Sequence, residues 1–230
     1  MSHERSVAID GPAGSGKSTV ARGLARALGY RYVSTGDIYR ALALAVLRNG
    51  IDPHNEKDVS SLARKVTIEV EESDDGSQIT VLDGEDVSDL IKQPEVDAVV
   101  SPVSAHAEVR AWLVDLQRRL ADERDVVMDG RDIGTVVLAR SKHKFFLTAS
   151  AEERARRRWK EYVAKGRNVD FDTVLKEVQA RDTIDSGRAV APLMVAPDAV
   201  VVDCTHMTVQ EVIDEMLRKL GRADLCSTMS

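Results

Sequence analysis

The chain has 230 residues and a mass of 25.2 kDa, which is enough to bury a substantial core and fits one domain with insertions. The 38 acidic residues outnumber the 32 basic ones, so the net charge is -6 and a nonspecific nucleic-acid binder is disfavoured. The first ten residues lack an apolar signal-peptide core, and no apolar run approaches the roughly 18 residues of a membrane span. We therefore expect a soluble, cytoplasmic protein.

The chain begins with an apolar strand followed by a glycine-rich turn and a helix. The strand is predicted at residues 6–10, and the turn reads G-P-A-G-S-G-K-S from Gly11. A helix is predicted from Lys17 to Leu28, because Val20, Leu24 and Leu28 recur on one face and Gly29 can cap its end. This order of strand, turn and helix is the context in which a phosphate-binding loop works.

The next segments alternate between strand and helix and then break the pattern. A strand is predicted at 30–34, and a helix at 38–48. Residues 65–91 instead contain two strand-like runs around the turn signal SDDGS and a further turn, so we predict a small β insertion there. A helix follows at 106–122, and Pro102 is expected to separate it from a shorter segment before it.

The second half restores the alternation. Strands are predicted at 125–129, 143–149 and 199–204, and the runs VVM, FFL and VVV are continuously apolar, as in strands buried on both faces. Capping-box patterns at 150–153 and 208–211 open helices toward Lys165 and toward residue 220. The whole pattern predicts an α/β fold with a five-stranded parallel sheet flanked by helices. The two cysteines, Cys204 and Cys226, lie far apart and without metal-ligand spacing, so no disulfide framework or zinc site is expected.

The glycine-rich turn matches the phosphate-binding pattern G-x-x-x-x-G-K-[ST]. Its glycines allow backbone N–H groups to surround a polyphosphate, and the following helix presents its positive end to the same site. Lys17 adds a cation for the β- and γ-phosphates, and Ser18 offers a hydroxyl to Mg²⁺. We expect ATP and Mg²⁺ as cofactors, with the nucleotide bound by Gly11, Pro12, Ala13, Gly14, Ser15, Gly16, Lys17, Ser18 and Thr19.

A phosphate-binding loop alone does not distinguish a kinase from a switch or a motor. The N-K-x-D motif of guanine-nucleotide switches is missing, and a motor or transporter ATPase needs a longer chain and partner subunits. A compact kinase with a small acceptor is the interpretation that these absences favour.

Three charged stretches follow predicted strands or precede the last one, where an acceptor site would be built. They are STGDIYR at 34–40, DGRDIGT at 129–135 and ARDTIDSGRAVAPL at 180–193. Asp129 is suited to orient metal-bound water, and Arg131 to bind a phosphate with its guanidinium fork. The alternatives are a solvated charged turn at 129–132 and a surface ion pair between Arg181 and Asp185.

Four arginines occur together in EERARRRWKEY at 152–162: Arg154, Arg156, Arg157 and Arg158. A solvated helix face is the usual explanation for such a run. Phosphoryl transfer also needs positive charge around the transferred group, which arginines on a mobile flap can supply. We expect at least one of the four to act in catalysis.

Together, IDGPAGSGKST, STGDIYR, DGRDIGTVV, ASAEERARRR and RDTIDSGRAVAPL resemble the bacterial cytidylate kinase family over roughly residues 6–220. The resemblance implies a P-loop kinase domain over 1–230. Within it would lie a nucleoside-monophosphate-binding region at 35–105, which includes the β insertion, and an arginine-rich lid region at 150–190. Two positions depart from the family pattern: Ser18 stands where many relatives have glycine, and Thr35 where serine is expected.

The same resemblance implies transfer of the γ-phosphate of ATP to CMP or dCMP by a monomeric enzyme without nucleic-acid or membrane partners. Tyr39, Arg40, Arg131 and Arg188 would hold the acceptor phosphate, and Arg181 and Asp185 the ribose. Ser101, Arg110 and Asp132 would read the base, with Thr35 near it. The catalytic residues would be Lys17, Asp129, Arg131, Arg157, Arg158 and Arg188, and the metal ligands Ser18 and Asp129.

Three rival hypotheses remain at this stage. A kinase for UMP or another small acceptor, such as shikimate, could use the same core. A regulatory switch would bind the nucleotide without phosphorylating a small molecule, and a nucleic-acid end kinase is disfavoured by the net negative charge. A carboxylate such as Asp132 suits cytosine, because the exocyclic amino group of cytosine donates a hydrogen bond where uracil presents an oxygen.

Overall fold

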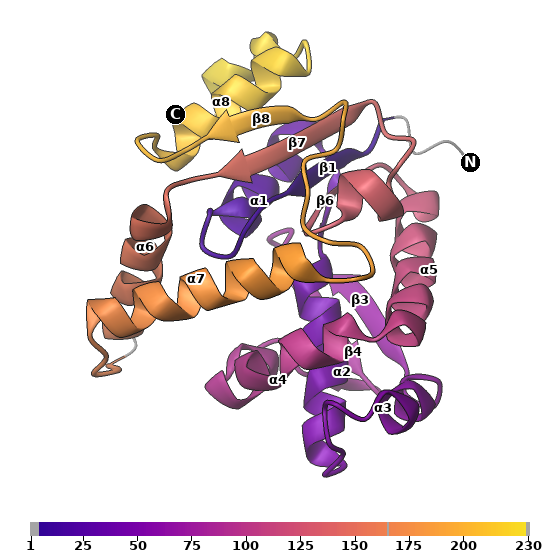
Figure 1. Cartoon of the computed structure of the whole chain (residues 1–230). Coiled ribbons are helices and arrows are strands. Elements are labelled where there is room, and N and C mark those ends of the chain that lie inside the picture. The colour runs from indigo at the N-terminus through magenta and orange to yellow at the C-terminus, as the bar shows by residue number, and fades with distance from the viewer. Residues whose placement is uncertain (1–4, 165, 229–230) are drawn as a thin grey trace.

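A computed structural model describes residues 5–164 and 166–228. Within them, a parallel sheet has five strands: β1 (Val7–Asp10), β2 (Arg31–Ser34), β6 (Val126–Gly130), β7 (His143–Thr148) and β8 (Val200–Asp203). Their spatial order is β2-β6-β1-β7-β8 (Figure 1). The five predicted strands and the parallel sheet are confirmed.

Side-chain alternation along the strands divides the core between the two faces of the sheet. Val126 and Met128 pack on one face in a cluster with the helices α2 (Thr35–Arg48), α4 (Pro94–Ala105) and α5 (Ala107–Glu123). Val127 packs on the other face, with α1 (Lys17–Leu28) and α8 (Val209–Lys219). Both faces of the central strands β1 and β6 are therefore covered, as predicted for the run VVM. The run VVV of the edge strand β8 is not buried on both faces as predicted, because Val201 is 53% exposed.

The β insertion is an antiparallel sheet beside the edge strand β2. It contains β3 (Ile68–Glu72), β4 (Gln78–Leu82) and β5 (Glu85–Asp86), and it follows α3 (Glu56–Ala63). The side chain of Gln78 joins it to the main sheet by accepting a hydrogen bond from the backbone N–H of Ser34 at 2.7 Å. The insertion thereby lies directly beside the segment that enters α2.

Two helices form a further layer that crosses the molecule. In Figure 1, α7 (Phe171–Gly187) runs between the main sheet and the region of α2 and α4, and α6 (Ala151–Ala164) lies beside it. A small apolar cluster that includes Ala155, Val174 and Val178 holds the pair together. The predicted helix end at Lys165 lies outside the described residues.

One local prediction is wrong. Pro102 does not separate two segments but lies inside α4, and the break before α5 comes four residues later, at His106. His106 adopts an extended backbone with ψ of 128°, which ends the helix, whereas Pro102 lies only three residues from the end of α4. The proline therefore removes one backbone donor without stopping the helix.

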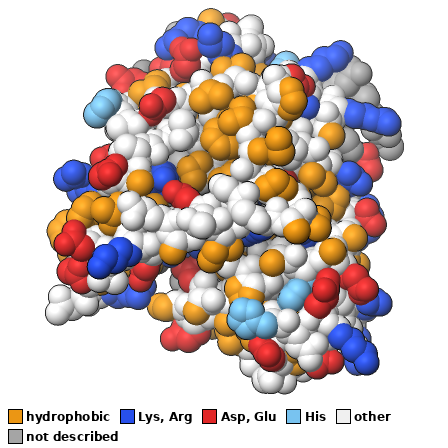
Figure 2. Space-filling view, viewed as in Figure 1, with side chains coloured by type: hydrophobic (Ala, Val, Ile, Leu, Met, Phe, Trp, Pro, Cys, Tyr) orange, Lys and Arg blue, Asp and Glu red, His pale blue; other side chains and the backbone are white. Residues whose placement is uncertain are grey.

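The surface of the described residues supplies two further observations. No helix in this part of the chain is both long and apolar enough to cross a membrane. Hydrophobic side chains gather over the connection between α7 and β8, where Val190, Met194 and Val195 are exposed (Figure 2). They do not line the cavity that contains Lys17.

Candidate active site

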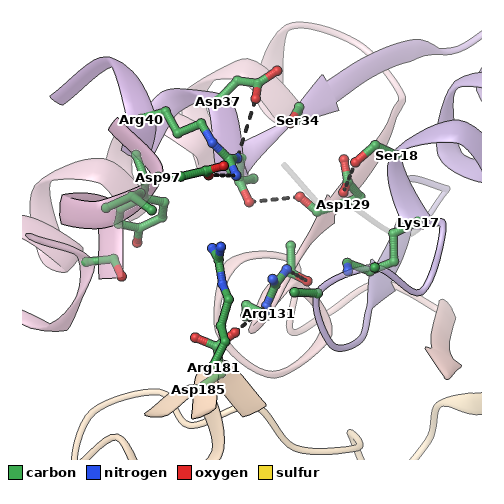
Figure 3. Close-up of a pocket in the computed structure, with 18 of the residues that line it drawn as sticks. Lys17, Ser18, Ser34, Asp37, Arg40, Asp97, Asp129, Arg131, Arg181 and Asp185 are labelled. Atoms are coloured by element: carbon green, nitrogen blue, oxygen red, sulfur yellow. Dashed lines mark hydrogen bonds and ion pairs between the residues drawn. The ribbon is translucent and has the colours of Figure 1, made fainter. Parts of the chain in front are cut away.

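A cavity of about 350 Å³ opens between the start of α1, the carboxyl end of β6 and the helices α2, α4, α6 and α7 (Figure 3). Among its lining residues, cationic side chains outnumber acidic ones, which makes it a site for anions. The cationic ones are Lys17, Arg22, Arg40, Lys92, Arg110, Arg131, Arg158, Arg181 and Arg188, and the acidic ones are Asp37, Asp97, Asp129, Asp132, Glu161 and Asp185.

The glycine-rich turn lies at one end of this cavity. Gly14 and Gly16 have φ of 75° and 87°, a backbone region that other residues adopt only at a cost, and α1 begins directly afterwards. Gly11 has φ of 152°, and a Cβ there would overlap the carbonyl oxygen of Leu147. The N–H groups in the first turn of α1 have no intrahelical acceptors, so the turn and helix together present donors for an anion.

Lys17 is only 5% exposed and extends over the turn, where its Nζ donates to the carbonyl oxygen of Pro12 at 2.7 Å. Burial, and to a lesser degree the nearby Arg131 guanidinium, lower the pKa of Lys17 well below its ordinary value. The carboxylates of Asp129 and Asp10 act in the opposite direction. A polyanion bound here would favour the charged ammonium, so the positive charge of Lys17 is stabilised when an anion binds.

Asp129 lies at the end of β6 and is held by three hydroxyl groups. Its carboxylate accepts hydrogen bonds from Ser18 at 3.0 Å and Tyr32 at 2.9 Å, and Thr35 donates to its backbone carbonyl at 2.8 Å. The Ser18 hydroxyl and the Asp129 carboxylate are the hard oxygen ligands that Mg²⁺ prefers, and Mg²⁺ usually takes only one or two protein carboxylates. In the described part of the chain no cluster of three or more metal-ligating side chains was found, so the donor set fits Mg²⁺ that is shared with phosphates and water.

The four arginines of α6 have different positions. Arg158 lines the cavity, whereas Arg156 is exposed and pairs with Glu153. Arg157 donates to the carbonyl oxygens of Ser15 at 3.2 Å and Cys204 at 2.8 Å, and it does not line the cavity. Its contact with the donor turn is through the peptide carbonyl of that turn.

The buried member of the four, Arg154, was not singled out by sequence reasoning. It donates to the carbonyl oxygen of Ala13 at 3.1 Å and makes a two-pronged ion pair with Asp182 of α7 at 2.9 and 2.6 Å. Arg154 therefore ties the donor turn to both helices of the layer that crosses the molecule.

The acceptor side of the cavity is built around Asp185, which is 1% exposed at the end of α7. Arg131 donates to its carboxylate at 2.8 Å and Arg188 at 2.5 Å. Arg181 makes no ion pair with Asp185 in the described residues, so the alternative of a surface ion pair between the two is wrong. Its Nε is buried and has no hydrogen-bond partner among the described residues.

The base-reading residues predicted by resemblance lie partly together. Asp132 and Arg110 form a buried ion pair, and the Arg110 guanidinium lies over the ring of Tyr39 at 5.5 Å. Tyr39 thus lies beside the pair. Ser101 does not line this cavity but an adjacent one, and Ser104 takes part instead, by accepting a hydrogen bond from Arg188 at 3.2 Å.

Sequence reasoning missed Asp10, which positions the loop after β6. Its carboxylate accepts hydrogen bonds from the backbone N–H groups of Ile133 at 2.8 Å and Gly134 at 2.7 Å, where the π-helical turn η2 (Ile133–Val137) begins. Burial raises the pKa of Asp10 to about 6. A carboxylate at the end of an apolar strand, directly before the glycine-rich turn, was the signal that could have identified it.

Comparison with known proteins shows the family of the chain. The cytidylate kinase family model matches residues 7–222. The chain is 48% identical over 222 residues to cytidylate kinase from Caldanaerobacter subterraneus subsp. tengcongensis, covering 95% of this chain and 97% of the relative. It is 53% identical over 223 residues to cytidylate kinase from Mycobacterium avium, covering 96% and 97%.

A solved structure of an uncharacterized protein from Eubacterium ventriosum is similar with a TM-score of 0.51 and 12% identity, over 95% of this chain and 99% of that one. This likeness concerns the fold alone. The family model and the two relatives span nearly the whole chain. The chain therefore belongs to the cytidylate kinase family.

Proposed function

We propose that this enzyme, a nucleoside monophosphate kinase by its family, transfers the γ-phosphate of ATP to the 5'-phosphate of CMP or dCMP by direct in-line displacement. One observation carries the proposal. A single cationic cavity joins Lys17 and the donor turn to the arginines around Asp185 and to the buried pair of Asp132 and Arg110.

At the donor end, the turn from Gly11 to Thr19 would bind the triphosphate, and Lys17 would neutralise its β- and γ-phosphates. Ser18 and Asp129 would hold Mg²⁺, which when bound neutralises charge on the phosphates. Three of the four arginines of α6 have tasks in this proposal. Arg158 would neutralise charge on the reacting groups once the substrates are bound, and Arg154 and Arg157 hold the turn through its carbonyl groups.

At the acceptor end, Arg40, Arg131 and Arg188 would bind the phosphate of the acceptor, and Arg181 and Asp185 its ribose. Asp132 would accept a hydrogen bond from the exocyclic amino group of cytosine, and Arg110 would hold Asp132 in place. Tyr39 and Ser104 would complete the wall beside the base. Ser101 would contact the base only after α4 moves, because it now lines the adjacent cavity.

The acceptor phosphate is already an anion, so positioning and charge neutralisation can supply the catalysis without a covalent phosphoenzyme. Closure of the nucleoside-monophosphate-binding region (35–105) and of the lid region (150–190) would exclude water and limit hydrolysis of ATP. We expect the enzyme to act in the cytoplasm as a monomer on small molecules, in line with its net charge of -6.

The test is ADP formation from MgATP with CMP, dCMP, UMP, AMP, GMP or shikimate, beside a reaction without acceptor. The proposal predicts strong turnover with CMP and dCMP, and turnover near the control with the other acceptors. Turnover with UMP equal to that with CMP would favour the broader pyrimidine kinase. A flat response with all acceptors would favour a nucleotide-dependent switch.

A further inference from the structure

Asp97 of α4 lies between arginines that come from two other helices. Its Oδ1 accepts a hydrogen bond from Arg40 of α2 at 2.9 Å (Figure 3). Its Oδ2 accepts one from Arg158 of α6 at 3.2 Å. All three side chains are about a quarter exposed and line the cavity that holds Lys17. The carboxylate therefore bridges α2 and α6 across the cavity.

A third arginine faces the same place. Arg181 of α7 reaches toward Arg40 and Asp97 in Figure 3, and its buried Nε has no hydrogen-bond partner among the described residues. Burial, and then repulsion from Arg131 and Arg40, lowers the pKa of Arg181 to about 10. Asp37 also pairs with Arg40, at 3.7 Å, so two carboxylates face three arginines and positive charge remains in excess.

The arginines that contact Asp97 could bind a phosphate group in the same way. Each carboxylate oxygen of Asp97 takes one guanidinium, as two phosphate oxygens would. A nucleoside monophosphate brings a charge of about -1.5 to -2 and three acceptor oxygens, against one charge and two oxygens for the carboxylate. Because Asp97 is partly exposed, its released carboxylate can return to water at low cost.

We propose that the Asp97 carboxylate competes with the acceptor phosphate for the same arginines. Asp97 pairs with Arg40 and Arg158 until CMP binds and displaces it. The inference rests on the proposed function of this cavity. While the link is intact, Arg158 is tied to α4 and cannot turn toward the donor phosphates. Asp97 therefore weakens CMP binding and also restrains ATP hydrolysis when no acceptor is present.

The test compares Asp97→Asn with wild type by calorimetric titration with CMP in the absence of ATP. We expect the Kd for CMP to fall about fivefold, the effect of losing one partly exposed competing charge. ATP hydrolysis without acceptor should rise several-fold, and the KM for CMP should fall. Glu95→Gln is the matched control, because Glu95 is an exposed acid on the same helix as Asp97 that does not line the cavity, and it should leave all three values unchanged.

The direction of the change separates this idea from a purely structural role. If Asp97 only positions Arg40, Asp97→Asn raises the Kd for CMP, and that result or an unchanged Kd overturns the inference. Asp97→Ser is a second variant, and thermal unfolding of each variant shows whether it is folded. CMP binding of equal strength in all variants overturns the inference alone, whereas no CMP binding by wild type overturns the proposed function with it.

Discussion

At the level of single residues, the burial of Lys17 determines its dependence on a bound anion. Its pKa is lowered well below the ordinary value because the ammonium is 5% exposed and lies near Arg131. We expect Lys17→Ala to reduce turnover at least about 10³-fold, since it removes a preorganised charge from the transferred group. ADP formation measures this, and calorimetry should show CMP binding within about twofold of wild type. Undiminished turnover would contradict the assignment of the donor turn.

Asp132 is the residue on which discrimination between bases depends in our proposal. Asp132→Asn keeps the shape of the side chain but presents a donor as well as an acceptor, so it should weaken the contact with cytosine. We expect kcat/KM for CMP to fall about 10- to 100-fold and kcat/KM for UMP to fall much less. Equal losses for the two substrates would contradict base reading. Thermal unfolding is the control for a loss of stability, because the substitution leaves the buried Arg110 without its charged partner.

The two most informative carboxylates outside the predicted site, Asp10 and Asp97, show what a sequence leaves hidden. Asp10 contacts residues 123 and 124 positions away, and Asp97 contacts Arg40 and Arg158 from 57 and 61 positions away. The P-loop residues were predictable because one local motif contains both the turn and the helix start. Asp97 belongs to no motif, and only the packing of α4 beside α2 brings it into the cavity.

At the level of elements, strands were easier to predict than helices. Burial on both faces makes a central strand such as β6 continuously apolar over its first residues, and that pattern is visible in the sequence alone. The continuous helix α7 was not predicted, because only its small apolar cluster with α6 is buried and most of its polar side chains face either solvent or the cavity. The predicted break at Pro102 was wrong because a proline near the end of a helix removes one backbone hydrogen bond without ending the helix.

The turn between β1 and α1 depends on the smallest residue at its start. A Cβ on Gly11 would overlap the carbonyl oxygen of Leu147 on β7, and its φ of 152° is unfavourable for other residues. We expect Gly11→Ala to lower the free energy of unfolding by about 2–5 kcal/mol, through backbone strain and overpacking. Urea unfolding measures it. Gly187→Ala is the control, with no atom within 4 Å of the added Cβ, and a loss of equal size there would contradict the steric explanation.

At the level of the whole molecule, the pairing of Asp185 with two arginines links α7 to the loop after β6 and to the segment that leads to β8. Burial alone would raise the pKa of Asp185, but Arg131 and Arg188 outweigh it and hold the pKa below its ordinary value. The folded state therefore binds this proton less readily than the unfolded chain does. The resulting stability is present above about pH 4 and is lost as the pH falls toward the folded-state pKa.

Asp185→Asn should therefore lower the free energy of unfolding by about 3 kcal/mol at pH 7, since it leaves buried guanidinium groups without their charged partner. The difference in the free energy of unfolding between Asp185→Asn and wild type should become smaller as the pH falls from 5 to 3. Urea unfolding at pH 7, 5, 4 and 3 measures it, with the exposed Asp89→Asn as the control. A difference that stays constant or widens toward low pH would contradict the linkage.

The hydrogen bonds from Ile133 and Gly134 to Asp10 have a consequence for the length of the acceptor. Asp10 directly precedes the donor turn, so one buried carboxylate fixes both the start of that turn and the loop that carries Asp132. The spacing between the reacting phosphate of the donor and the proposed base contact is thus set by the sheet rather than by a moving helix. We therefore expect this fixed spacing to select the length of the acceptor: a nucleoside would not bring an oxygen to the γ-phosphate, and a nucleoside diphosphate would not fit between the two sites.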